Sequence, residues 1–285
     1  MGWFANGAHR ASKLVTSARA LILAGAVLSL GTFAAVPTVA AASPIKVVIV
    51  VGPNGDSGVA SNIASAQNLA AQARGYGATV IEIYSPNATW AKVEAAAQGA
   101  NVLIDMGHGN GWPSPYAPYQ ENTKDGLGLN ATANHGNSNV KYYGANYIRK
   151  YIHLAANSVV ILRGLCYSAG NSEPGNPIPS LTAGKQRVDN FAAGFLKAGA
   201  KDVFAEPYGD VGYILTYLFT GKDSAKNIFL YGNRGGWAQP SVGTKLISYG
   251  STRTKGDTIL ANRDSTGHFR RSVAGKLTSV VTFMH

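Results

Sequence analysis

Short continuous runs of apolar, mostly β-branched residues recur along the sequence, and segments with helical periodicity separate them. The first run, residues 45–51, has the composition of a strand that is buried on both faces of a sheet. Further strands are expected at residues 78–84, 101–106, 159–162 and 201–205, and helices at residues 57–74, 89–97, 143–156, 187–199 and 211–221. Strands that alternate with helices in this way build a parallel sheet with helices on both faces. The sequence therefore predicts an α/β fold, a three-layer sandwich around a mostly parallel sheet.

The N-terminal stretch, residues 1–42, has the layout of a secretory signal peptide. Arg10, Lys13 and Arg19 precede an apolar run at residues 21–35, and the stretch ends in small alanines and holds no acidic residue. We therefore expect a protein that is secreted or displayed at the cell surface, with no membrane contact after signal cleavage. The alternative is an uncleaved membrane anchor. No later run reaches the roughly 18 apolar residues that a transmembrane helix needs.

The rest of the chain is expected to form one α/β domain at residues 43–236 and a small C-terminal β appendage at residues 237–285, where short β-like runs replace the helical pattern. Lys and Arg number 25 against 14 Asp and Glu, so the formal net charge is +11. This excess favours anionic cell-surface polymers as partners. The basic residues are scattered and do not alternate with aromatic residues on one element, so nucleic acid is not expected as a partner.

Cys166 is the only cysteine in the chain. Exported proteins usually use cysteines in pairs, so a single thiol indicates an intermolecular bridge, a reactive residue or an inert side chain in the core. Its position favours the reactive residue, because it follows the apolar run 159–162 in a loop that contains glycines. His108 follows the run 101–106 in an equally glycine-rich turn. One thiol and one imidazole, each just beyond a buried strand, are the parts of a nucleophile and its acid/base partner.

The expected sheet would bring these two residues together. If the two strands are neighbours, His108 and Cys166 lie side by side at the carboxyl ends of the strands, where the functional loops of such sheets gather. Residues 107–139, between them, are rich in Gly, Pro, Asn and Tyr, and we expect an irregular functional loop there. Gly109 has no side chain, so its N–H can approach a substrate carbonyl closely and stabilise an oxyanion together with the N–H of Cys166.

Two short motifs, GHGNG around His108 and LCYSAG around Cys166, each follow an apolar strand. This arrangement resembles the clan CD cysteine peptidases, which include caspases, metacaspases, gingipains, clostripain and CHAT-type proteases. The run FAAGFLKAGAKDVFAEPYGD is similar to the segment that follows the cysteine in CHAT-type and gingipain-like domains. The resemblance spans residues 45–230, and it departs at Leu165, where those families often have Ala or Ser.

The resemblance implies a caspase-like sheet and an exported cysteine endopeptidase. His108 would be the general acid, Cys166 the nucleophile, and the amides of Gly109 and Cys166 the oxyanion donors, acting on a protein or peptide with no cofactor and no metal. In caspase-like folds the loop after the next strand helps to form the specificity pocket, and here that loop carries Glu206 and Asp210. Two acids there would favour Lys or Arg at the cleaved position, unless both are solvated turn residues.

Two further expectations concern the surroundings of the site. Asp105 and Arg163 each precede a site residue by three positions, so a matched register would pair them as supporting residues that hold the two loops. The segment 171–187 is rich in Pro and Gly and is expected to be an exposed loop. By the resemblance, Lys185 or Arg187 would be a point of self-cleavage, and the alternative is a passive loop.

Three other functions compete with the peptidase. The first is a catalytically silent caspase-like module for surface binding or assembly. The second is a nucleotide-binding domain, suggested by three glycines after the first strand, Gly52, Gly55 and Gly58, with Glu82 near the end of the next strand. The spacing of these glycines does not match the dinucleotide fingerprint. The third is a carboxylate-based hydrolase, and no pair of its candidates has a spacing that predicts a shared site: Glu82, Asp105 and Glu121.

Overall fold

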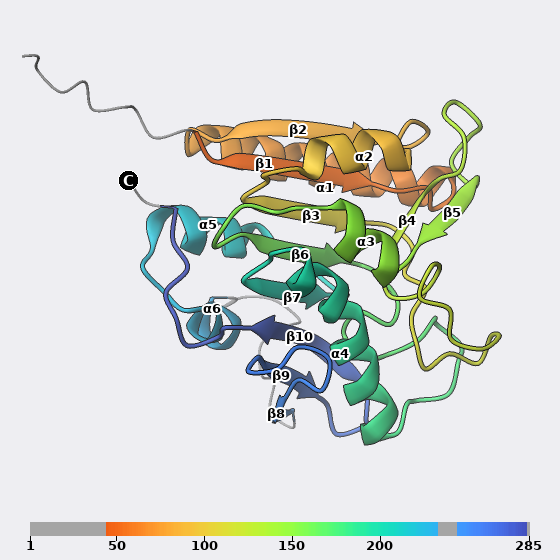
Figure 1. Cartoon of the computed structure of the whole chain (residues 1–285), viewed down its shortest axis with the longest axis vertical. Helices are drawn as coiled ribbons and strands as arrows, with labels where there is room; N and C mark the ends of the chain where they lie inside the picture. The colour runs from red at the N-terminus through yellow and green to blue at the C-terminus, as the bar shows by residue number, and fades with distance from the viewer. Residues whose placement is uncertain (1–43, 233–243, 284–285) are drawn as a thin grey trace, which may run out of the picture. The chain divides into compact units, whose positions relative to one another are not determined.

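The β-branched runs form one eight-stranded sheet with the strand order β2-β1-β3-β6-β7-β10-β9-β8 (Figure 1). The computed structural model describes residues 44–232 and 244–283, so the expected signal peptide lies outside the described residues. The strands of this sheet are β1 (Lys46–Val51), β2 (Thr79–Tyr84), β3 (Val102–Met106), β6 (Val159–Arg163), β7 (Asp202–Glu206), β8 (Lys245–Gly250), β9 (Thr258–Arg263) and β10 (Phe269–Gly275).

Five neighbouring strands, β2, β1, β3, β6 and β7, run parallel. They are the five strands that the sequence predicts, to within one residue at each end. Every residue of β3 and β7 is buried, as expected for strands with helices on both faces. The α/β class with a large sheet and a parallel core is therefore confirmed.

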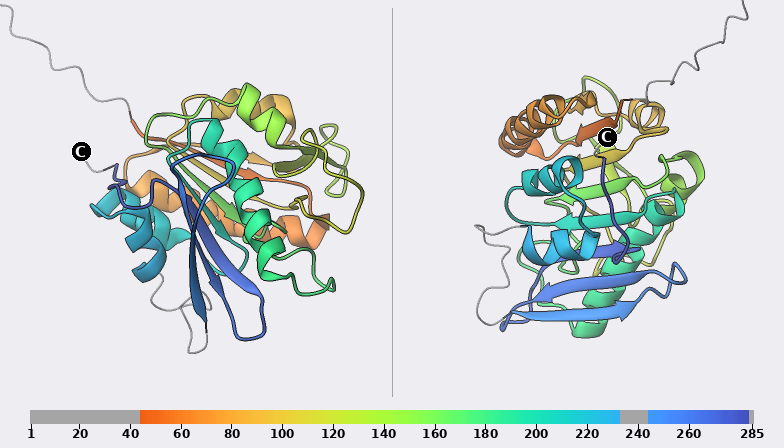
Figure 2. Two further views of the ribbon diagram at one scale, coloured as in Figure 1. Left: turned by 60° about the horizontal axis from the view of Figure 1, so that its bottom comes forward. Right: turned by 90° about the vertical axis from the view of Figure 1, so that its left-hand side faces the viewer.

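Helices cover both faces of the sheet, and alternate strand residues supply two separate cores. Leu103 faces the side covered by α2, α3 and α4, whereas Ile104 faces the side covered by α1, α5 and α6 (Figure 2). The helices are α1 (Gly55–Gly75), α2 (Trp90–Ala97), α3 (Ala145–Tyr151), α4 (Leu181–Lys197), α5 (Gly212–Thr220) and α6 (Ala225–Tyr231). No helix in the described ranges is long and apolar enough to span a membrane.

The C-terminal strands, expected as a small β appendage, extend the edge of the main sheet. β10 pairs antiparallel with β7, from Ser272 opposite Ala205 to Gly275 opposite Asp202, and β9 and β8 follow by antiparallel pairing. The physical reason is that β7 would otherwise present a row of unpaired backbone groups at the sheet edge, and β10 satisfies them.

A second, two-stranded sheet lies in the segment that was expected to be irregular: β4 (Leu127–Asn130) pairs antiparallel with β5 (Val140–Tyr143). β4 is short and contains a glycine, so it has no local pattern that distinguishes it from a loop. Tertiary contacts hold it: the side chain of Asn130 accepts a hydrogen bond from the Ala88 N–H at 3.0 Å and donates to the Ser85 hydroxyl at 3.2 Å. This hairpin covers the carboxyl ends of the parallel strands (Figure 1).

Candidate active site

The loops that carry His108 and Cys166 lie side by side at the carboxyl ends of the parallel strands. β3 and β6 are hydrogen-bonded neighbours, in a register that places Met106 opposite Arg163. His108 comes two residues after Met106, and Cys166 comes three residues after Arg163. The prediction that the two strands are neighbours is confirmed, while the roles of the two residues stay a prediction.

Two glycines allow the two loops to pack directly against each other. A β-carbon on Gly109 would lie 2.0 Å from the carbonyl oxygen of Cys166, and a β-carbon on Gly111 would lie 2.2 Å from Cβ of Tyr167. Both separations are far below van der Waals contact, so only glycine fits at these positions. The glycine-rich turn around His108 is therefore explained by the close approach of the turn around Cys166.

The β4–β5 hairpin covers the opposite side of His108. A β-carbon on Gly128 would lie 2.9 Å from the carbonyl oxygen of His108 and 3.1 Å from Cε1 of Tyr142. Burial, and then the charge on an ionised Cys166, raise the pKa of the Tyr142 hydroxyl, so this phenol lies within electrostatic reach of the thiol. The sequence analysis missed Tyr142 because it missed the hairpin that places it.

Burial favours the neutral forms of both His108 and Cys166. Burial lowers the pKa of the His108 imidazole, and the negative charge of Glu173 acts in the opposite direction. Burial raises the pKa of the Cys166 thiol, and the charge of Glu173 raises it further. Neither side chain forms a hydrogen bond to another residue within the described part of the chain. The resting site is therefore a neutral thiol and a neutral imidazole on interlocked loops.

The two predicted oxyanion donors remain available. The N–H of Gly109 donates no hydrogen bond to a described residue, and the N–H of Cys166 interacts only with its own sulfur. Gly109 is buried and Cys166 is partly buried, so bulk water has limited access to these groups. Two backbone donors on neighbouring loops, neither bonded to another described residue, are the elements of an oxyanion hole.

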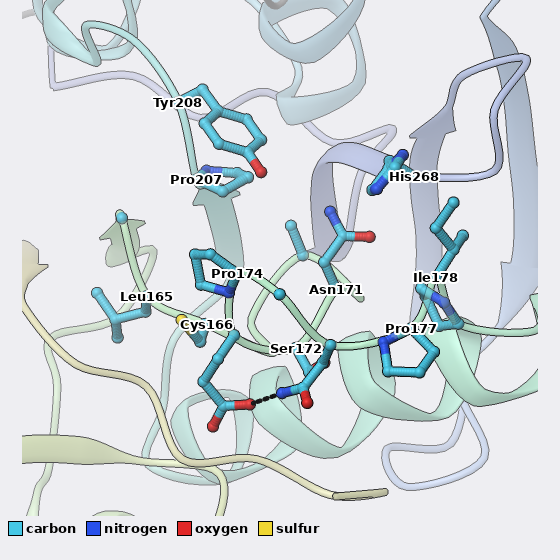
Figure 3. Close-up of a pocket in the computed structure, with 16 residues that line it drawn as sticks. Leu165, Cys166, Asn171, Ser172, Pro174, Pro177, Ile178, Pro207, Tyr208 and His268 are labelled. Carbon is cyan, nitrogen blue, oxygen red and sulfur yellow. Dashed lines mark hydrogen bonds between the residues drawn. The ribbon is translucent and has the colours of Figure 1, made fainter. Parts of the chain in front are cut away.

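A cavity of about 330 Å³ opens beside Cys166 (Figure 3). The segment after β6 and the loop after β7 form most of its wall, and His268 completes it from the β9–β10 turn. Much of the wall is apolar, with contributions from Leu165, Pro174, Ile178 and Pro207. Among the described residues that line the cavity, Glu173 is the single carboxylate, and no Lys or Arg is present.

Tyr167 and Asn176 hold Glu173 in place. The Tyr167 hydroxyl donates to Oε2 of Glu173 at 2.6 Å, and Nδ2 of Asn176 donates to the same oxygen at 2.8 Å. Tyr167 is buried and has a φ of +68°, a left-handed conformation that costs about 1–2 kcal/mol in a residue with a side chain. Its N–H donates to the carbonyl of Asn171 at 2.7 Å, so the tight turn after Cys166 is stabilised by its own backbone.

Arg187 joins the two site loops from α4. Its guanidinium donates to the carbonyls of Pro113 at 2.7 Å and Gly170 at 3.2 Å, and it lies over the ring of Tyr167, 5.1 Å from the centroid. Burial lowers the pKa of Arg187, and the charges of Tyr167 and Glu173 act in the opposite direction. The sequence analysis placed this residue where an exposed loop ends and a helix begins, whereas it is 7% exposed and lies inside α4.

The expected self-cleavage at Lys185 or Arg187 meets a structural obstacle. α4 begins at Leu181, where the Ser180 hydroxyl accepts a hydrogen bond from the Ala183 N–H at 3.1 Å. Both basic residues therefore lie inside a capped helix, and the loop of residues 171–180 before it holds no Lys or Arg. The earlier helix start overturns the expectation of an exposed loop up to residue 187.

The predicted pairing of Asp105 with Arg163 is wrong. The register places Asp105 opposite Leu162, so the two side chains point to opposite faces of the sheet. Nη1 of Arg163 donates to Oδ1 of Asn62 at 3.2 Å, on the side of α1. Asp105 is 1% exposed, its Oδ1 has no hydrogen-bond partner among the described residues, and burial raises its pKa to about 8.

The acids Glu206 and Asp210, expected in the specificity pocket, lie outside the cavity. Glu206 is 1% exposed and forms an ion pair at 3.0 Å with Nε of Arg271, and the Tyr213 hydroxyl donates to it at 2.6 Å. Asp210 is exposed, accepts a hydrogen bond from the Gly212 N–H at 3.0 Å at the start of α5, and lines a different hollow against α1. The loop does contribute to the cavity, but through Pro207 and Tyr208. Glu206 points to the face of the sheet that α5 covers, because alternate strand residues point to opposite faces.

The β4 strand packs directly against the glycine-rich turn after β1. A β-carbon on Gly52 would lie 2.2 Å from the carbonyl oxygen of Gly128, so β4 occupies the space where a nucleotide phosphate would have to sit. In the two described ranges no group of three or more His, Cys, Asp or Glu side chains gathers as a metal site.

The candidates for carboxylate-based hydrolysis lie in separate surroundings. Glu82 forms an ion pair with Arg74, Glu121 pairs with Arg149 at 2.8 Å, and Asp105 is buried in the interior strand β3. These contacts give no support to a shared carboxylate site.

No protein-family model matches this chain, and no curated protein matches it by sequence.

Proposed function

We propose that this chain is an exported, caspase-like cysteine endopeptidase in which Cys166 is the nucleophile and His108 the proton carrier. The observation that carries the proposal is the interlocking of two loops at the ends of β3 and β6, in which Gly109 rests on the backbone of Cys166 beside a cavity. A parallel sheet with helices on both faces and a site at the carboxyl ends of its strands supports a caspase-like arrangement.

The reaction would proceed through a thioester. The thiol proton passes by way of His108 to the nitrogen of the scissile amide, and the sulfur attacks the carbonyl carbon. The N–H groups of Gly109 and Cys166 stabilise the oxyanion, the carbon–nitrogen bond breaks, and the amine leaves with the proton. Water then hydrolyses the thioester, releases the carboxylic acid and restores the thiol. Because burial favours the neutral forms of both groups, the thiol would lose its proton as the sulfur attacks.

The test is cleavage of a mixed peptide library by the purified protein, with products identified by mass spectrometry. Cys166→Ala and His108→Ala should each lower the rate of product formation by at least about 1,000-fold. Circular dichroism and thermal unfolding show whether each variant keeps its fold. Products that form at an unchanged rate with folded Cys166→Ala would refute a thiol mechanism.

A second candidate is a catalytically silent caspase-like module that binds a surface or assembles with a partner. The observation in its favour is that no hydrogen bond joins His108 and Cys166 in the described residues, while burial raises the thiol pKa. The formal net charge is +11, and residues 1–42 contribute +3 of it. The +8 that the rest of the chain carries would direct such a module, or the peptidase, to anionic cell-surface polymers. Labelling of Cys166 by an electrophilic peptide separates the two functions, because only a working site places the carbonyl of the probe next to the sulfur.

A further inference from the structure

The cavity beside Cys166 carries one negative charge. Glu173 lines it, and no Lys or Arg lines it in the described part of the chain. Arg187, which lies over the ring of Tyr167, directs its guanidinium to the carbonyls of Pro113 and Gly170. Within the described residues Glu173 and Arg187 form no ion pair, so Arg187 does not neutralise the Glu173 carboxylate by direct contact.

Only one of the two carboxylate oxygens of Glu173 accepts hydrogen bonds from described residues. Oε2 accepts from both Tyr167 and Asn176, whereas Oε1 accepts from no described residue. The two donors orient the carboxylate, since a side chain anchored through one oxygen has its other oxygen fixed in direction. Glu173 lines the cavity, and a carboxylate held in one orientation can recognise a donor that carries positive charge.

The rest of the wall suits the stem of such a donor. Pro174, Ile178 and Pro207 present apolar surface to the cavity, and the ring of Tyr208 stands at its edge (Figure 3). Lys and Arg side chains bury an aliphatic stem and keep a charged tip, so they match an apolar wall that holds one carboxylate.

We propose that Glu173 is the specificity-determining residue of the site and that the cavity takes a lysine or arginine side chain next to the scissile bond; this inference rests on the proposed peptidase function. Because Oε2 is already occupied by two donors, the two-oxygen fork that arginine forms with a free carboxylate is blocked. The site therefore accepts lysine as well as arginine, with no strong preference for arginine.

The test uses peptidyl acyloxymethyl ketones, which alkylate an active-site thiol, in four versions with Lys, Arg, Asp or Leu next to the reactive ketone. The rate of Cys166 labelling is measured by intact mass for the wild type, Glu173→Gln and Asp210→Asn. The ratio of the Lys rate to the Leu rate should fall about 10- to 100-fold in Glu173→Gln, the size expected for a charge-assisted hydrogen bond. It should stay unchanged in Asp210→Asn, which removes the same charge from an acid outside the cavity.

The ratio is the informative quantity, because Glu173→Gln also changes the pKa of the thiol and so changes the rate of every probe alike. Iodoacetamide, which carries no side chain, measures that common effect. If peptide probes label Cys166 with no preference for Lys and Arg, or if the preference survives Glu173→Gln, the inference is overturned while the peptidase function stands. If iodoacetamide labels Cys166 but no peptide probe does, and no peptide is cut, the proposed function is overturned and the inference with it.

Discussion

Gly109 rests on the backbone of Cys166, so closely that a β-carbon would lie 2.0 Å from the carbonyl oxygen and 2.8 Å from the nitrogen of Cys166. The contacted atoms are backbone, and they cannot move aside without moving the turn that positions the thiol. The relative position of the two loops therefore depends on the absence of one carbon atom.

Gly109→Ala should displace the Cys166 turn. We expect a loss of about 1–3 kcal/mol in the free energy of unfolding, as for overpacking in a core, and a fall in peptide cleavage of about 100-fold. Urea unfolding and a cleavage assay measure the two effects. Gly75→Ala is the control, because a β-carbon at the end of α1 meets no atom within 4 Å. Equal stability and activity of the two variants would show that the loops adjust freely.

The thiol of Cys166 should react at higher pH than an ordinary cysteine. Burial, and then the charge of Glu173, raise its pKa, and the thiolate is the reactive form. Iodoacetamide alkylation, followed by mass spectrometry from pH 6 to pH 10, should therefore have a midpoint above the usual ~8.5. Glu173→Gln removes the negative charge and should move the midpoint to lower pH. An upward shift in that variant would contradict the electrostatic coupling.

Stability should fall as the pH rises through the range in which Asp105 is protonated only in the folded state. Burial raises the pKa of this carboxyl to about 8, from 3.8. Between about pH 4 and pH 8 the folded chain keeps the proton and the unfolded chain loses it, so the unfolding free energy falls by up to about 1.4 kcal/mol per pH unit.

Asp105→Asn removes this titration and isolates it from that of other acids. The stability of the Asn variant relative to the wild type should rise steadily from pH 4 to pH 8, as measured by urea unfolding. Parallel stability curves for the two proteins over this range would mean that Asp105 does not hold a proton in the fold.

Glu206 should contribute to stability and not to specificity. It and Arg271 are each 1% exposed and 3.0 Å apart, and Glu206→Gln leaves the cation of Arg271 without its carboxylate. We expect a loss of about 3–5 kcal/mol in unfolding free energy. Arg74→Ala, which breaks the partly exposed pair with Glu82, should cost no more than about 1 kcal/mol. A loss at Glu206 as small as that at Arg74, or a changed cleavage preference in folded Glu206→Gln, would contradict this assignment.

The sequence alone predicts the parallel core and the neighbourhood of the site. Runs such as residues 45–51 are so apolar that they must be buried on both faces, and the alternation with helices then leaves few topologies. That logic places His108 and Cys166 on neighbouring loops, and the strand pairing agrees. The prediction succeeds because a short run of β-branched residues by itself indicates a buried strand, and because the right-handed crossover rule limits how parallel strands can be connected.

Only the tertiary structure decides which polar side chains meet. A one-residue difference in register separates Asp105 from Arg163, because adjacent strand residues point to opposite faces. The same alternation turns Glu206 away from the cavity, and the hairpin that places Tyr142 has no local signal. Glu173 enters the cavity wall because Tyr167 and Asn176 hold it there. Such contacts join residues through space, and each depends on the register and turn geometry of several segments at once, which residue order does not encode locally.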